Sequence, residues 1–159
     1  MSVQVLQPSF PVRFNDINTD NIERRLTIKL PELTCEEIKE LIIEYKKFLL
    51  LFSLYKDENY LLAPGHLVDE VWHEHILHSK QYYEDCIKIF DGVILHHFPS
   101  ANEEGESLSD TYMLYEKTFN TKPPEKFWLN RLLSGSNAPC CGNGGGTTGC
   151  RGGNCSPGK

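Results

Sequence analysis

The segment from Thr34 to Tyr55 limits the fold more than any other, because its pattern suits a long helix. Thr34-Cys35-Glu36-Glu37 fits the S/T-x-x-E capping box, in which a hydroxyl and a carboxylate satisfy exposed backbone N–H groups. Apolar side chains then recur at helical spacing: Ile38, Leu41, Ile42, Tyr45, Phe48, Leu49 and Phe52. Because this stripe is wide, it predicts a helix at the centre of a bundle.

Later segments also have helical patterns with clear end signals. Pro64 and Gly65 open a helix to about Leu77, and a break at His78–Ser79 allows a fresh helix after it. Three helical segments are expected after this break: 80–90, 109–120 and 125–133. The first of them is expected to stop at Asp91-Gly92. The chain is therefore predicted to be all-α, a small irregular bundle of four or five helices.

The two ends of the chain are expected to differ from this bundle. Residues 1–25 predict an irregular arm with a helical turn near Thr19–Arg25, and Leu26–Leu30 (LTIKL) alternates like a short strand or extended connector. After Ser134 the sequence is rich in Gly and Cys and almost free of apolar residues, which predicts a disordered tail. The expected division is an arm over 1–23, a helical domain over 24–133 and a tail over 134–159.

Composition narrows the functional classes. The 159 residues carry a net charge of −6 and no strongly basic stretch, which disfavours nucleic acid and anionic membranes as partners. The most apolar run, Phe48–Leu54, is too short to cross a bilayer, and the N-terminus lacks the pattern of a signal peptide. We therefore expect a cytoplasmic protein whose cysteines are mostly reduced.

The histidines are concentrated in two short pieces of the chain. All six lie within 66–78 and 96–97: His66, His73, His75, His78, His96 and His97. Clustered imidazoles beside carboxylates are what a zinc or iron site needs, because neutral imidazole is the commonest nitrogen ligand at neutral pH.

Helical geometry decides which of these side chains can share a metal ion. Asp69 and His73 lie one turn apart on one face, whereas His73 and His75 lie about 200° apart around the helix. The predicted site is therefore Asp69 and His73 completed by His97 from the following loop. His75 is then either a buried, hydrogen-bonded residue or a ligand on the other side.

Other interpretations of the histidines stay open. The string His73-Glu74-His75-Ile76-Leu77-His78 is not the HExxH motif of zinc proteases, because position 77 is Leu. A core histidine bonded to an aspartate, with His96-His97 as a polar turn, would need no metal. The histidines would then be structural parts of an interaction or scaffold domain with a protein partner.

These motifs resemble a known family. The pattern D-x-x-W-H-x-H at 69–75, a following Tyr83 and G-x-x-L-x-H at 92–97 are similar to the glycine-rich domain-containing protein-like family. The strings E-Y-x-x-F-L at 44–49 and Y-x-x-x-F at 115–119 also match, so the resemblance covers about residues 24–130. It marks as signature positions Asp69, Trp72, His73, His75 and His97. The resemblance implies no established reaction.

A metal-dependent enzyme is the remaining hypothesis, with Glu70 or Glu74 as general base and an open coordination position. The tail cysteines could also bind zinc, but their CC-x8-C-x4-C spacing lacks the paired C-x2-C units of structural zinc sites; they are Cys140, Cys141, Cys150 and Cys155. Cys35 and Cys86 are expected to be packing residues.

Overall fold

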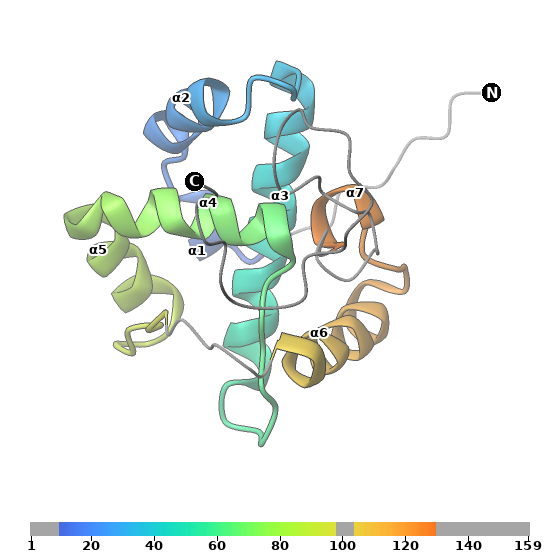
Figure 1. Cartoon of the computed structure of the whole chain (residues 1–159). Coiled ribbons are helices and arrows are strands. Elements are labelled where there is room, and N and C mark those ends of the chain that lie inside the picture. Colours follow the sequence, from blue (N-terminus) through green and yellow to red (C-terminus); the bar gives the residue numbers. More distant parts are fainter. Residues whose placement is uncertain (1–9, 98–103, 130–159) are drawn as a thin grey trace, which may run out of the picture.

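The computed structural model describes residues 10–97 and 104–129, and over these ranges the chain is helical without a strand (Figure 1). The helices are α1 (Val12–Asn15), α2 (Asp20–Lys29), α3 (Cys35–Tyr55), α4 (His66–Leu77), α5 (Ser79–Ile89), α6 (Glu104–Phe119) and α7 (Glu125–Trp128). The predicted all-α class is confirmed. The two helices beyond the expected number are the four-residue α1 and the N-terminal α2.

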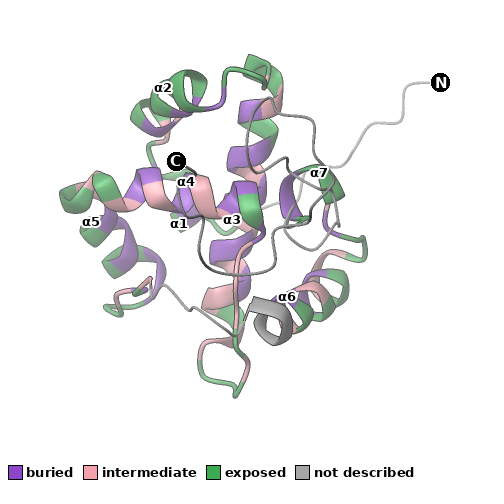
Figure 2. Ribbon diagram, in the orientation of Figure 1, coloured by how far each residue is buried: buried purple, intermediate pink, exposed green. Residues whose placement is uncertain are grey.

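Helix α3 is the central element, and its start is the predicted one. The Thr34 hydroxyl accepts a hydrogen bond from the Glu37 N–H at 3.2 Å, and the Glu37 carboxylate accepts one from the Thr34 N–H at 2.7 Å. Helix α4 lies across α3 and also contacts α2, α5 and α7 (Figure 1). Figure 2 shows buried residues along α3 and on the parts of α4 and α5 that face the interior.

The expectation of a short strand or an extended connector at Leu26–Leu30 is wrong, because residues 26–29 belong to α2 and Leu30 is its C-cap. Ile22, Leu26 and Leu30 are spaced by four and are buried, so the helical period overrides the local alternation. Helix α2 also crosses the expected boundary between residues 23 and 24. The helical turn expected near Thr19–Arg25 is confirmed as the start of α2.

The breaks between the later helices agree well with the sequence. His78, with φ −85° and ψ 57°, separates α4 from α5, as expected. Asp91 and Gly92 follow the end of α5 with φ values of 54° and 92°. Positive φ angles of this kind suit Gly and are tolerated by Asp. Helix α6 begins earlier than predicted, at Glu104. The last helix stops at Trp128, because Leu129 is extended with ψ 124°.

A buried carboxylate joins three helices. Glu44 on α3 is 5% exposed and accepts hydrogen bonds from three side chains: Lys47 Nζ at 2.7 Å, Tyr115 Oη at 2.8 Å and Trp128 Nε1 at 2.9 Å. The apolar pattern of α3 did not reveal this role. Because buried charges must be paired, the network fixes α6 and α7 against α3.

Of the two cysteines expected to be packing residues, one is buried and the other is exposed. Cys86 is 1% exposed and packs in the core as expected, whereas Cys35 is exposed, so its expected packing role is wrong. The tail and its four cysteines lie outside the described residues. Within the described ranges, no helix has both the length and the apolar character needed to cross a bilayer.

Candidate metal centre

The first part of the candidate site comes from one face of α4. Helix α4 begins at His66, so Asp69 lies in its first turn, where the helix dipole favours a carboxylate. His73 follows one turn later, and its Nε2 lies 3.6 Å from Asp69 Oδ2. The predicted pairing of Asp69 with His73 is therefore present.

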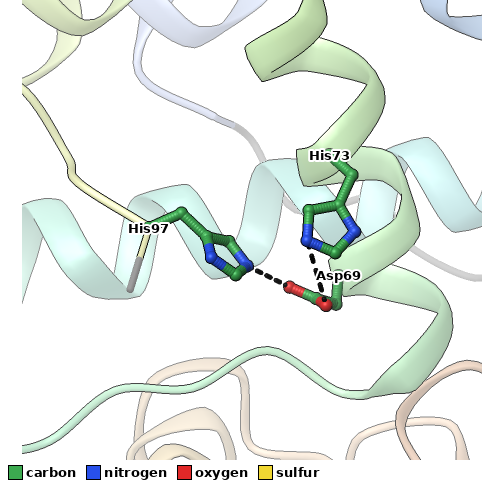
Figure 3. Close-up of side chains that lie close together, drawn as sticks. All are labelled: Asp69, His73 and His97. Carbon is green, nitrogen blue, oxygen red and sulfur yellow. Dashed lines mark hydrogen bonds and ion pairs between the residues drawn. The ribbon is translucent and has the colours of Figure 1, made fainter. Parts of the chain in front are cut away.

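His97 completes the cluster from the segment that follows α5. Its Nε2 lies 2.8 Å from Asp69 Oδ1, and its ring centroid lies 4.7 Å from that of His73 (Figure 3). The positive φ angles at Asp91 and Gly92 turn the chain after α5, ahead of this residue. Each oxygen of the Asp69 carboxylate thus faces a different imidazole.

The spacing of these groups suits a small metal ion. One ligand atom from each of Asp69, His73 and His97 can be chosen so that all lie within 4.8 Å of one another. A tetrahedral zinc ion with ligand bonds of about 2.0 Å needs ligand atoms roughly 3.3 Å apart. The two measured distances to the carboxylate lie on either side of that value, so small side-chain movements would accommodate an ion.

The cluster is partly open to solvent. The side chains of Asp69, His73 and His97 are 31%, 43% and 21% exposed, respectively. Two imidazoles and one carboxylate are the donor set of many catalytic zinc sites and of non-haem iron(II) sites, both of which keep open coordination positions. The arrangement can therefore hold a metal and still admit water or another ligand.

His75 lies away from this cluster, on the other side of α4. It is 1% exposed, with Nδ1 at 2.8 Å from Tyr45 Oη and Nε2 at 3.2 Å from Asp85 Oδ2. Both ring nitrogens therefore have protein partners. Of the two roles expected for His75, this geometry is that of the buried, hydrogen-bonded residue.

Sequence reasoning missed both partners of His75. Asp85 lies on the buried face of α5, which also contains Tyr82, Cys86 and Ile89. A carboxylate within an apolar face requires a buried partner, and this signal could have identified Asp85.

The other histidines do not join the cluster. His66 and His96 are exposed, and His78 Nδ1 lies 2.8 Å from the Glu74 carbonyl oxygen at the end of α4. Neither His66 nor His78 is among the positions that the resemblance marks as signature.

Both glutamates proposed as general bases are engaged with α2. Glu70 pairs with Lys29 at 2.6 Å, and Glu74 pairs with Lys29 at 3.2 Å and with Arg25 at 3.3 Å. Burial alone would raise the pKa of Glu74, but the hydrogen bonds from Lys29 and Arg25 bring it below its ordinary value. Neither carboxylate is a free base beside Asp69.

Over the described residues, the fold and this geometry are those of an all-helical domain with a partly exposed aspartate–histidine cluster. Its sequence matches the UCP032817-like family over residues 14–123, and the chain belongs to that family. Similar proteins include two from Arabidopsis thaliana, which confirms the resemblance to the glycine-rich domain-containing protein-like family.

Both plant relatives are much longer than this chain. Glycine-rich domain-containing protein 1 is 29% identical over 93 residues, which are 54% of this chain and 11% of the relative. Glycine-rich domain-containing protein 2 is 28% identical over 109 residues, which are 64% of this chain and 13% of the relative. No solved structure gives a significant match.

Proposed function

We propose that the chain is a metal-binding module that holds zinc or iron(II) through Asp69, His73 and His97. The observation that carries this proposal is the convergence of one carboxylate and two imidazoles, from α4 and a distant segment, within 4.8 Å. Imidazole and carboxylate ligands suit zinc and iron better than they suit softer metals, which prefer thiolate.

The shared carboxylate supports a metal rather than a purely structural role. When no metal is bound, the hydrogen bond between Asp69 and His97 and the 3.6 Å contact between Asp69 and His73 would hold the ligands near their final positions. Binding then uses the lone pair of one nitrogen of each ring while the ring proton lies on the other nitrogen, and it costs little side-chain freedom. Bound zinc or iron would act as a Lewis acid, with the remaining coordination positions open to solvent.

Metal content in matched variants tests this proposal. The full chain is purified without chelator, and zinc and iron are measured by elemental analysis. We expect stoichiometric metal in the wild type and its loss in His73→Ala and His97→Ala. His66→Ala is the control, because this exposed histidine lies on the same helix outside the cluster. Equal metal content in all four proteins would overturn the proposal.

The tail requires a separate variant. Replacing Cys140, Cys141, Cys150 and Cys155 with serine removes the thiols while the chain stays full length. We expect this variant to keep its metal, since the ligands are in the helical domain. Loss of metal in this variant alone would assign the site to the tail.

An interaction domain is the second candidate function, in which a protein partner binds in the cytoplasm. Tyr83 and Ile87 support it, because these apolar side chains are 58% and 38% exposed and lie one turn apart on α5. On this hypothesis, His73→Ala and His97→Ala lower stability without changing metal content.

A further inference from the structure

The position of His97 depends on how its segment is held, because residues 93–97 have no helical structure of their own. Leu95, two residues earlier, is 6% exposed, and its carbonyl oxygen accepts a hydrogen bond from the hydroxyl of Tyr82. Tyr82 lies on α5 and is 8% exposed. A buried hydroxyl on a regular helix therefore holds the backbone next to the candidate ligand.

Trp72 links the same hydroxyl to the cluster. Its indole Nε1 donates a hydrogen bond to Tyr82 Oη at 3.0 Å, and its ring centroid lies 4.4 Å from that of His97. Trp72 directly precedes His73 on α4. The contacts thus run from α4 to Tyr82, on to Leu95, and back to α4 through His97.

The direction of these hydrogen bonds is fixed by their chemistry. An indole N–H can only donate and a carbonyl can only accept, so the Tyr82 hydroxyl accepts from Trp72 and donates to Leu95. Burial raises the pKa of Tyr82, which keeps the hydroxyl protonated at neutral pH. Replacing Tyr82 with phenylalanine would remove both hydrogen bonds and keep the ring that contacts His75 at 5.0 Å between centroids.

We propose that Tyr82 is a positioning residue for metal binding, whose hydroxyl, aligned by Trp72, fixes Leu95 so that His97 meets Asp69 and His73. This inference rests on the proposed metal site. Groups that orient metal ligands reduce the cost of assembling the site, and their removal typically weakens metal affinity roughly 10- to 100-fold.

Zinc titration of the metal-free full chain tests the role of Tyr82. We expect Tyr82→Phe to weaken zinc affinity roughly 10-fold or more, with unchanged helix content by circular dichroism. Tyr83→Phe is the matched control, since the neighbouring side chain is 58% exposed, and it should bind zinc like the wild type.

A double-mutant cycle separates positioning from general destabilisation. If Tyr82 acts through His97, Tyr82→Phe should not weaken the residual zinc affinity further in a His97→Ala background. An equal loss in both backgrounds would overturn the inference. If Tyr82→Phe loses helix content, Trp72→Phe serves in the same cycle, because it removes the indole donor and keeps an aromatic ring beside His97.

The two proposals fail in different ways. A wild-type chain that binds no zinc and no iron(II) overturns both the metal site and the positioning role. A wild type that binds zinc, with Tyr82→Phe binding equally well, overturns only the positioning role.

Discussion

Helix α4 carries two histidine–aspartate groups that use the same side-chain types in different ways. On one side, His73 and the loop residue His97 share Asp69 in a partly exposed cluster. On the other side, His75 is enclosed between Tyr45 and Asp85. The histidines that α4 contributes to the two groups, His73 and His75, are only two residues apart in the sequence.

The difference shows that burial and the number of protein partners, rather than residue type, decide what a histidine can do. In the neutral tautomer that satisfies both contacts, His75 Nε2–H donates to the Asp85 carboxylate and Nδ1 accepts from the Tyr45 hydroxyl. Burial raises the pKa of Tyr45 strongly, so the hydroxyl remains a donor. No ring nitrogen of His75 is left for a metal. In the exposed cluster, by contrast, one carboxylate serves two rings that solvent can reach.

The largest expected effect is on stability at the buried group. His75→Ala should lower the free energy of unfolding by about 3–5 kcal/mol, because it opens a cavity in the core and removes the ring partner of Asp85 and Tyr45, and only Gln81 Nε2 at 3.4 Å still bonds Asp85. His73→Ala, at an exposed position, should change it by only about 0.5 kcal/mol. Urea unfolding of the metal-free proteins measures both values, and similar losses in the two variants would contradict the distinction.

The next effect concerns metal-dependent stabilisation. Zinc at 100 times its dissociation constant should raise the unfolding free energy of the wild type by about 2.7 kcal/mol, because it binds only the folded chain. Asp69→Asn should abolish this gain. Asp85→Asn should keep the gain while starting from a lower stability. Thermal unfolding with and without zinc provides the measurement, and a gain preserved in Asp69→Asn would break the comparison.

A smaller effect is expected at Tyr45. Tyr45→Phe keeps the buried ring and leaves Nδ1 of His75 without a donor, which should cost about 1–3 kcal/mol. Zinc affinity should not change, since the hydroxyl contacts only the buried group. Denaturant unfolding and zinc titration of the same sample would show both results, and a weaker zinc affinity would link the two groups.

The smallest effect involves the side of α4 that faces α2. Glu74→Gln should lower stability by about 1 kcal/mol at pH 7, because the partners Arg25 and Lys29 are largely solvated. The folded pKa of Glu74 lies below its ordinary value of 4.5, so its contribution is complete above that pH and is lost as pH falls. The wild type and Glu74→Gln should therefore converge in acid unfolding curves, and a constant difference down to about pH 3 would refute this.

Sequence alone predicted the parts of this fold that follow from local pattern. The capping box at Thr34, the break at His78 and the stop at Asp91-Gly92 each depend on nearby residues, and each is present. The pairing of Asp69 with His73 followed from helical pitch. That His97 lies beside Asp69 and His73 could only be hypothesised from the sequence, because its position depends on the path of the chain after α5.

Long-range packing supplied what the sequence could not show. LTIKL at 26–30 alternates locally, but contact with α3 and α4 favours the helical face of α2. Glu44 and Asp85 are polar residues within apolar faces, and each has a partner on another helix, Trp128 for Glu44 and His75 for Asp85. Neither pairing has a signal in local spacing.

The Glu44 network includes a residue of α7, so it affects where the chain can be shortened. A chain cut before Trp128 would lose the indole N–H that donates to Glu44 Oε2, and only Lys47 and Tyr115 would still donate to this buried carboxylate. A cut beyond Leu129 would leave every donor to that carboxylate in place. Expression fragments of this protein should therefore end downstream of α7, whatever length of glycine-rich sequence is removed.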